Sequence, residues 1–137
     1  DIDGTLADNK WRDPYDMTNV LHDGIIWPIV DLADTLKRQL GAKLLIMSAR
    51  PAGAQVVTDT TEWLSHTSLQ WDGLYMRAEG DSRPDAEVKA EIYDAAIFPN
   101  YNVKYVIDDR NSVVEMWRGK GLTVLQVADG SFLEEVV

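Results

Sequence analysis

The stretch Asp1-Ile2-Asp3-Gly4-Thr5 decides how the rest of the chain is interpreted. Its two carboxylates stand two positions apart, so both face the same side of an extended backbone. Gly4 permits a sharp turn directly after them, and Thr5 adds a hydroxyl group and a backbone N–H. Carboxylates in this arrangement can attack phosphorus, carry a proton and share a magnesium ion. We therefore expect a strand end and a catalytic pocket here.

Two simpler interpretations of this stretch compete with a catalytic one. A calcium-binding loop needs Gly at its sixth position and a bidentate Glu at its twelfth, but Leu6 and Arg12 stand there. A plain turn has the same Asp and Gly composition, and the five residues alone do not distinguish it from a site. The rest of the chain has to decide.

The composition fits one domain spanning residues 1–137 with a substantial core. The absence of cysteine excludes disulfides, thiolate zinc sites and thiol nucleophiles. No run is apolar enough to span a membrane and no signal peptide is visible, so we expect a cytoplasmic protein without membrane contact. If a phage encodes the chain, this is the host cytoplasm.

The formal net charge of −10 argues against a broad basic face that grips a long duplex. Any contact with nucleic acid is expected to be short and local, such as one strand end. If Asp1 ends a strand, that strand lies upstream, and we expect the sequence to be a piece of a longer protein.

Hydrophobic patterns predict helices that alternate with short apolar strands. We expect helices at 28–40, 53–67, 84–98 and 112–117, and strands at 43–47, 74–76, 103–107 and 122–127, followed by a short polar and acidic tail. Continuous apolar runs are typical of parallel strands buried on both faces. The alternation predicts an α/β fold, with a parallel sheet and helices on both of its faces.

The long connection at 6–27 is expected to fold over the pocket as a small lid. Trp11 and Tyr15 lie within it, and buried anchoring is favoured over contact with a base or sugar for both. Arg12 can reach a phosphate, although the sequence alone favours a surface position.

Polar side chains follow the strand predicted at 43–47. Ser48 can donate to a phosphate oxygen or cap a helix, and Arg50 can bind a substrate phosphate. They fall where open α/β sheets bind ligands, because the carboxyl ends of parallel strands meet at one edge.

A second polar group follows the strand predicted at 103–107. Asp108 and Asp109 are adjacent acids, which are costly to crowd together unless a cation is present. Lys89 lies near a helix start, where the helix dipole disfavours it, so either a site role or a surface position is open. It can also pair with Asp85 at i, i+4.

The combined set resembles the haloacid dehalogenase (HAD) superfamily of phosphatases, whose motifs follow in this order: Asp-x-Asp-Gly-Thr, Ser or Thr, Lys and an acidic pair. The resemblance covers nearly the whole chain. Within this superfamily, the chain most resembles the phosphatase domain of bacteriophage polynucleotide kinase/phosphatase. The stretches that match are Asp-Ile-Asp-Gly-Thr-Leu-Ala at 1–7, Arg12 with Pro14-Tyr15-Asp16, Ser48-Ala49-Arg50, Arg83-Pro84-Asp85 before Val88-Lys89, and Ile107-Asp108-Asp109-Arg110 with 113–118.

This resemblance implies a HAD-like, Rossmannoid three-layer sandwich with a small cap or none. In that family a kinase domain with a P-loop precedes the phosphatase. No Gly-rich phosphate-binding loop occurs in these residues, so a kinase domain in the parent protein stays an open expectation.

The resemblance also implies roles for the acidic residues. Asp1 would form an aspartyl-phosphate, and Asp3 would protonate the departing sugar oxygen and then activate water. Mg²⁺ would be held by the Asp1 carboxylate, the Asp3 backbone carbonyl and Asp109, with Asp108 in support.

The remaining roles concern the substrate. The residues implied to bind the transferring phosphoryl group are Thr5, Ser48 and Lys89, with Asp85 orienting Lys89. Arg12 and Arg50 match functional arginines of the family and would bind substrate.

The favoured function is Mg²⁺-dependent removal of a 3′-phosphate from DNA or RNA ends in nucleic acid repair. One alternative is a nucleotidase or small-ester phosphatase of the same superfamily. Another is a catalytically inert binding domain, against which the intact acidic set argues because idle clustered carboxylates destabilise a fold. The sequence does not distinguish DNA, RNA and mononucleotide substrates, and it leaves the oligomeric state open.

Overall fold

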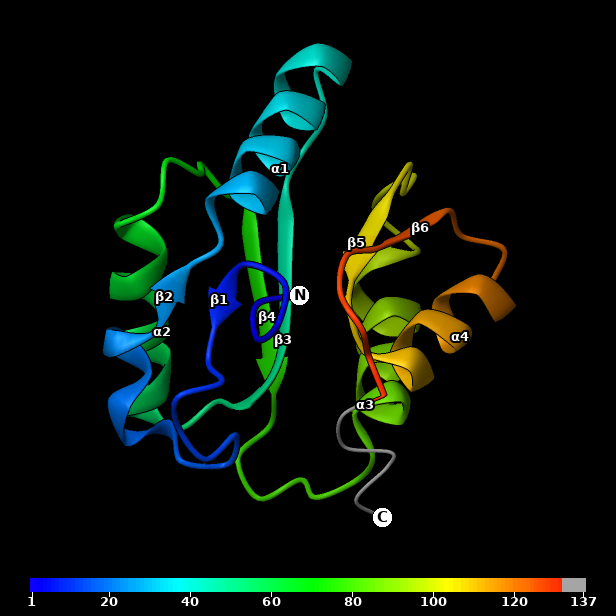
Figure 1. Ribbon diagram of the computed structural model, residues 1–137. Helices are drawn as coiled ribbons and strands as arrows, with labels where there is room; N and C mark the ends of the chain where they lie inside the picture. The colour runs from blue at the N-terminus through cyan, green and yellow to red at the C-terminus, as the bar shows by residue number, and fades with distance from the viewer. Residues whose placement is uncertain (132–137) are drawn as a thin grey trace.

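The computed structural model describes residues 1–131. Its helices are α1 (Trp27–Leu40), α2 (Ala54–Ser65), α3 (Asp85–Ile92) and α4 (Asn111–Gly119), with a 3-10 helix η1 (Met17–His22) and a π-helical turn η2 (Tyr93–Ile97). Its strands are β1 (Ala7–Asp8), β2 (Gly24–Ile25), β3 (Leu45–Pro51), β4 (Gly73–Arg77), β5 (Val106–Asp108) and β6 (Val124–Gln126). The predicted alternation of helix and strand is confirmed (Figure 1). The end of the predicted acidic tail lies outside the described residues.

Helix α1 shows how closely local chemistry sets the element boundaries. Pro28 stands in its first turn, where the missing N–H is not needed. Gly41 ends the helix in the left-handed conformation, with φ of 60°. Between them Val30 and Ala33 are buried on the inner stripe. The predicted helix at 28–40 is therefore confirmed to within one residue.

The helix predicted at 84–98 is present, but its second half widens. Regular α3 passes into η2, where the Phe98 N–H donates to the Tyr93 carbonyl, a bond spanning five residues. The Tyr93 ring is buried there and packs edge-on against Trp117, with ring centroids 5.6 Å apart. The wider turn thus coincides with an aromatic contact between α3–η2 and α4.

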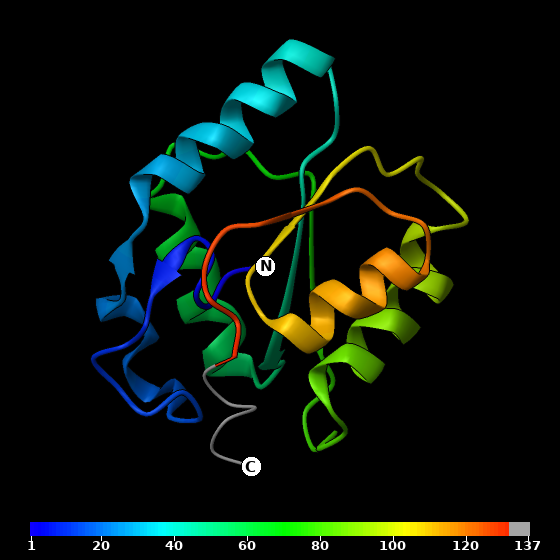
Figure 2. The ribbon, with the colours of Figure 1, turned by 45° about the vertical axis from the view of Figure 1, so that its right-hand side comes forward.

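The strands form parallel pairs. β3 pairs with β4 and β5 pairs with β6, while β1 and β2 form a small antiparallel pair. Asp1 lies between β3 and β5, which are not paired with each other among residues 1–131 (Figures 1 and 2). A cavity of about 560 Å³ lies there, lined partly by both strands. The predicted strand ahead of Asp1 would lie outside the residues of this sequence and stays a prediction.

Strand β3 separates two hydrophobic clusters. Adjacent residues point to opposite faces of a strand, and Ile46 and Met47 accordingly belong to different clusters. The first also contains Ile2, Leu6, Ala7, Val30, Ala33, Trp63, Leu64 and Leu69. The second also contains Tyr93, Ile97, Val113, Val114, Trp117 and Val124. Since α1 and α2 contribute to the first and η2 and α4 to the second, helices cover both sides of the strands, and the predicted three-layer α/β architecture is confirmed.

The connection at 6–27 is more ordered than an irregular lid. It contains β1, η1 and β2, and η1 packs against α2. The Trp63 indole of α2 donates to the backbone carbonyl of Asp23 at 2.9 Å and fixes the end of this segment. No helix within residues 1–131 has the length and apolar character needed to cross a membrane.

Candidate active site

Asp1, Lys89 and Thr5 form the first of two polar networks at the strand ends. Lys89 lies in α3, its side chain is 3% exposed, and its ammonium contacts Asp1 Oδ1 at 2.9 Å and Asp108 Oδ2 at 3.1 Å. The Thr5 hydroxyl lies 3.1 Å from Asp1 Oδ2 and 3.2 Å from Asp109 Oδ1. These contacts join the first residues of the chain to the end of β5.

The acidic pair at the end of β5, Asp108 within the strand and Asp109 directly after it, is held by the backbone and by α4. Asp108 is 2% exposed, and its carboxylate accepts hydrogen bonds from the Asp109 N–H at 2.9 Å and from the Trp117 indole at 3.3 Å. Carboxylate oxygens of Asp1, Asp108 and Asp109 lie within 4.8 Å of one another. The predicted convergence of Asp1 and Asp109, more than a hundred residues apart, is therefore confirmed.

Gly4 allows Asp109 to approach this closely. Its φ is 79°, in the region that favours glycine, and a Cβ at this position would lie 2.2 Å from Asp109 Oδ2. Any side chain here would be strained and would displace the carboxylate. The glycine is thus required by the backbone turn and by the packing of the site.

The second network surrounds Asp3. Arg50 binds the Asp3 carboxylate through two nitrogen atoms, with Nε 3.0 Å from Oδ2 and Nη2 2.7 Å from Oδ1. Arg12 adds a contact from Nη2 to Oδ1 at 3.2 Å. Two parallel guanidinium hydrogen bonds fix both the position and the plane of a carboxylate, so Asp3 is held in one orientation beside Asp1.

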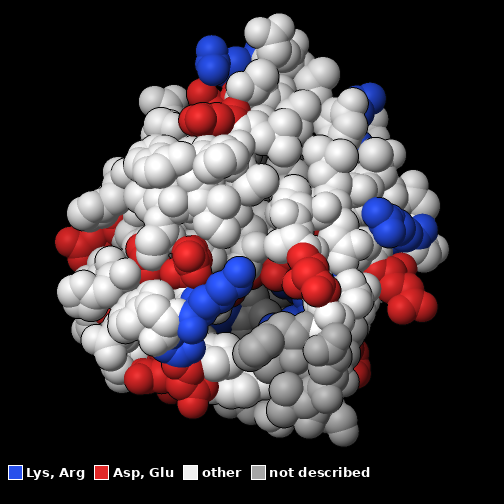
Figure 3. Space-filling view, viewed as in Figure 1, with Lys and Arg blue, Asp and Glu red and all other residues white. Residues whose placement is uncertain are grey.

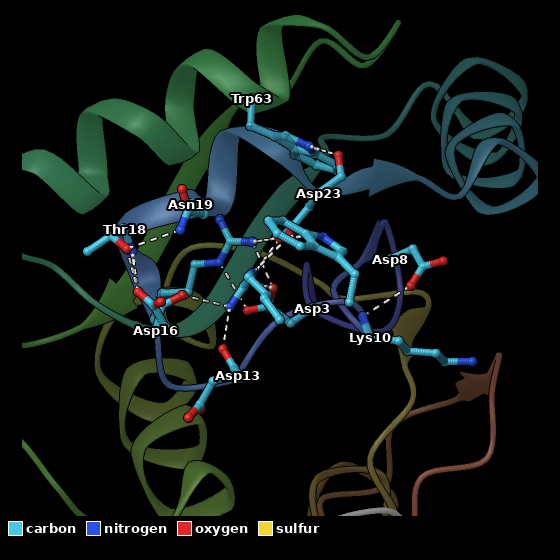
Figure 4. Close-up of polar contacts among 12 residues, drawn as sticks. Asp3, Asp8, Lys10, Asp13, Asp16, Thr18, Asn19, Asp23 and Trp63 are labelled. Carbon is cyan, nitrogen blue, oxygen red and sulfur yellow. Dashed lines mark hydrogen bonds and ion pairs between the residues drawn. The ribbon is translucent and has the colours of Figure 1, made fainter.

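Asp23, the residue between η1 and β2, completes this network, as the close-up in Figure 4 shows. Its side chain is fully buried. The carboxylate accepts hydrogen bonds from Nε and Nη2 of Arg12, both at 2.8 Å, and from Nη2 of Arg50 at 3.2 Å. The Trp11 indole donates to the same carboxylate at 3.1 Å. Asp23 therefore fixes the two arginines that hold Asp3.

Formal charges divide unevenly between the networks. In the second, two arginines balance the carboxylates of Asp3 and Asp23. In the first, the Lys89 ammonium contacts Asp1 and Asp108, and the side chains of Lys89, Asp1, Asp108 and Asp109 together carry a formal charge of −2. Three carboxylates around one point, with a double negative excess, suit a hard divalent cation such as Mg²⁺.

The acidic pair responds unequally to this crowding. Burial and the neighbouring Asp108 carboxylate raise the pKa of Asp109. The pKa of Asp108 is lowered: burial opposes this shift, but the Lys89 ammonium, the amino group of Asp1 and the hydrogen bond from the Asp109 N–H together outweigh it. In the second network, hydrogen bonds to Asp23 raise the pKa of Arg12 further above its ordinary value.

Several sequence-based predictions of side-chain exposure are wrong. Arg12 is not a surface residue: its side chain is 3% exposed, and acceptors within the protein occupy all five of its N–H groups. Lys89 is likewise buried rather than at the surface. Trp11 and Tyr15, for which burial was favoured, are 54% and 78% exposed.

The predicted contact between Asp85 and Lys89 is not formed. Asp85 instead binds Arg77 and Arg110, because the first turn of α3 faces these guanidinium groups while Lys89 points to Asp1 and Asp108. Asp85 does not orient Lys89 by contact.

The strand predicted at 43–47 continues as β3 to Pro51, so Ser48 and Arg50 lie within it. Ser48 is 1% exposed, and its hydroxyl accepts a hydrogen bond from the Arg50 N–H at 3.1 Å. It is not a helix cap, since Gly53 precedes α2.

Sequence reasoning missed three residues that support the site, namely Asp23, Arg77 and Trp117. Arg77 is 7% exposed and binds the Ala49 carbonyl beyond its contact with Asp85, which ties the end of β3 to the start of α3. Arg77 directly follows the strand predicted at 74–76, and Trp117 lies within the matching stretch 113–118, but no site role was assigned to either. Asp23 lies in the long connection at 6–27, where a buried acid carries no periodic signal.

An α/β fold with Asp1 and Asp3 beside a buried lysine and an acidic pair defines the phosphatase class of the HAD superfamily. A sequence model of the polynucleotide kinase PNKP phosphatase domain matches residues 1–132. The chain therefore belongs to the polynucleotide kinase phosphatase domain family.

Similar proteins are larger than this chain. A putative bifunctional polynucleotide kinase/RNA ligase of Autographa californica nuclear polyhedrosis virus is 30% identical over 120 residues, covering 86% of this chain and 17% of the relative. A chain in the structure of the Pnkp1/Rnl/Hen1 complex matches with a TM-score of 0.88 and 33% identity over 94% of this chain and 44% of its own length. A chain in the structure of the Pnkp1/Rnl/Hen1 RNA repair complex matches with a TM-score of 0.88 and 34% identity over 95% of this chain and 41% of its own length.

Proposed function

We propose that this domain removes a 3′-phosphate from DNA or RNA ends through an aspartyl-phosphate on Asp1. The observation that carries the proposal is the meeting of Asp1, Asp108 and Asp109 beside Lys89, next to an Asp3 carboxylate held by two arginines. Phosphoryl transfer depends mainly on positioning and charge compensation, and this arrangement supplies both. The relatives named above support a nucleic acid end as the substrate class.

In the first step an Asp1 oxygen attacks the phosphorus, and the bond from phosphorus to the sugar O3′ breaks. Asp3, which must carry a proton when the substrate is bound, gives that proton to the departing oxygen. In the second step Asp3 takes a proton from water, whose oxygen attacks the phosphorus and releases inorganic phosphate and free Asp1. Lys89 holds the attacking carboxylate, and its third N–H can contact the transferring oxygens.

The arginines serve Asp3 rather than the substrate in this scheme. Arg12 has no free N–H group to offer, since protein acceptors take all five. The Arg50 side chain is fully buried, and its Nη1 donates to the Thr60 hydroxyl at 3.0 Å. We propose that both residues orient Asp3, which revises the substrate-binding role expected from the sequence.

Mg²⁺ fits the three carboxylates of Asp1, Asp108 and Asp109. When bound, the cation would offset the repulsion between the attacking carboxylate and the phosphate. The Asp3 side chain is occupied by the arginines, so only its backbone carbonyl remains available as the ligand expected from the sequence. Thr5 and Ser48 are retained as proposed contacts to the phosphoryl group.

The test is a parallel assay of four substrates: a 3′-phosphorylated oligonucleotide, a 5′-phosphorylated one, mononucleotides and an aryl phosphate. We expect Mg²⁺-dependent phosphate release with a preference for the 3′ end, and none from an Asp1→Asn variant. Preference for mononucleotides would instead support a nucleotidase. No release from any of the four would support an inert binding domain.

The parent protein is proposed to carry further repair domains, including a kinase. The support is that this chain spans only part of its relatives, one of which is called a kinase/RNA ligase. Assay of 5′-kinase activity in the full-length protein tests this proposal.

A further inference from the structure

Trp11 combines exposure with a fixed orientation. It lies in the connection between β1 and η1 and is 54% exposed. Its indole N–H nevertheless donates to Asp23 Oδ1, and that carboxylate is fully buried. One edge of the ring is thus tied to the interior while much of its surface meets solvent. An aromatic ring held in this way has little rotational freedom left to lose when a flat partner binds.

Trp11 is also close to the proposed chemistry. Asp23, which accepts the indole hydrogen bond, also accepts one from Arg12 Nη2 at 2.8 Å, and the same nitrogen contacts Asp3 at 3.2 Å. One guanidinium group therefore separates the acceptor of the indole from the carboxylate proposed to protonate the sugar oxygen. In a nucleotide the base is attached to this same sugar, so when O3′ is at Asp3 the base is one sugar ring away from the network that holds the indole.

Lys10, next to Trp11, supplies an uncommitted positive charge. It is exposed, and its ammonium makes no hydrogen bond or ion pair with any residue of 1–131 that the structure describes. In Figure 4 its side chain extends away from the Asp3–Asp23 network. This differs from Lys89, whose charge is used within the site. A lysine beside an exposed ring suits the phosphodiester that precedes the terminal nucleotide.

We propose that Trp11 is the stacking platform for the terminal nucleobase of the substrate and that Lys10 contacts the adjacent phosphodiester. The inference rests on the proposed function, because it assigns a nucleic acid end to the same site. Stacking is tolerant of sequence, since every base has a flat face. It also suits a chain with a net charge of −10, whose visible face mixes acidic and basic side chains rather than forming one basic band (Figure 3).

The first experiment compares a normal 3′-phosphorylated oligonucleotide with one whose terminal nucleotide lacks its base. For the wild-type protein, loss of the base is expected to lower kcat/KM by about 5- to 150-fold, the range for one base stacked on an aromatic side chain. For Trp11→Ala the same loss is expected to cost less than about 2-fold, because the partner of the base is already gone. An equal cost in both proteins overturns the inference.

Two variants separate stacking from a merely structural role. Trp11→Phe keeps a flat ring but loses the N–H that binds Asp23, so it should retain most of the dependence on the base. If Trp11→Phe behaves like Trp11→Ala, the residue acts through Asp23 and the stacking proposal is wrong. Trp27→Ala is the matched control: Trp27 is 48% exposed at the start of α1, away from the connection between β1 and η1 in Figure 1, and should keep the full dependence.

Binding provides a readout that does not depend on turnover. In an Asp1→Asn background, the same two oligonucleotides are titrated and the ratio of their Kd values is compared between Trp11 and Trp11→Ala proteins. Lys10→Gln should weaken both oligonucleotides equally and lower the log–log salt dependence by about 0.7, the value for one phosphate of a single strand. If the wild-type protein cleaves an aryl phosphate but no oligonucleotide, the proposed function fails. The Kd ratio still decides whether the base stacks on Trp11.

Discussion

Asp23 offers the sharpest test of the arginine network. Its fully buried carboxylate accepts four hydrogen bonds, three from Arg12 and Arg50 and one from Trp11. The substitution Asp23→Asn preserves the size of the side chain but replaces one acceptor oxygen with an NH2 group. That group would face guanidinium N–H groups, donor against donor, and the negative charge between two buried arginines would be lost.

The expected magnitude follows from the burial of the network. Removing one partner of a buried charge pair costs about 3–5 kcal/mol, because the remaining charge is left uncompensated. We expect the free energy of unfolding to fall by this amount, a large part of the ~5–15 kcal/mol typical of a domain. In the fraction that stays folded, kcat should also fall, since Arg12 and Arg50 would no longer hold Asp3 in place.

The assay is urea unfolding of the wild-type and variant proteins, followed by tryptophan fluorescence. Asp34→Asn is the matched control, because its i, i+4 pair with Arg38 is solvent-exposed, with side chains 30% and 66% accessible. Such a surface pair contributes about 0–1 kcal/mol. If Asp23→Asn costs no more than this control, or if kcat is unchanged in the folded variant, the network does not act as described.

Three further predictions concern the first network. Gly4→Ala should abolish phosphatase activity and lower the Tm, because its Cβ would lie 2.2 Å from Asp109 Oδ2, whereas Gly119→Ala, with no atom within 4 Å, should lower neither. Lys89→Met should lower the Tm and enlarge its increase on addition of Mg²⁺, because the three-carboxylate cluster loses the ammonium group that contacts two of its members; an increase equal to that of the wild type would contradict the charge argument. Burial and Asp108 raise the pKa of Asp109 above its ordinary 3.8. Without Mg²⁺, the folded state therefore keeps a proton at pH values where the unfolded state has lost it. The free energy of unfolding falls as the pH rises from 3.8 to the higher pKa of the folded state. Mg²⁺ displaces that proton, so the difference in Tm with and without Mg²⁺ should grow with pH, and a difference independent of pH would refute the assignment.

Local sequence was sufficient for the longer helices and strands and for much of the site, although it did not indicate the short elements β1, η1 and β2. Pro28 and Gly41 mark the ends of α1 by their own backbone preferences, and the short apolar runs mark the buried strands. The carboxylates of Asp1 and Asp109 were predicted to meet because both stand at strand ends, and parallel strands bring their carboxyl ends to one edge. These features depend on residues that are neighbours in the chain or on a rule of topology.

The partners of the charged side chains were decided only by the tertiary structure. Asp85 had Lys89 within reach along its own helix but binds Arg77 and Arg110 instead. Arg50 finds Asp3 across 47 positions and Asp23 across 27, and no periodicity encodes such pairs. The sequence determined where strands and helices form, because backbone preference and apolar spacing act locally. Packing decided which charges are buried together, because a buried charge takes its partner from whatever the fold places beside it, at any distance along the chain.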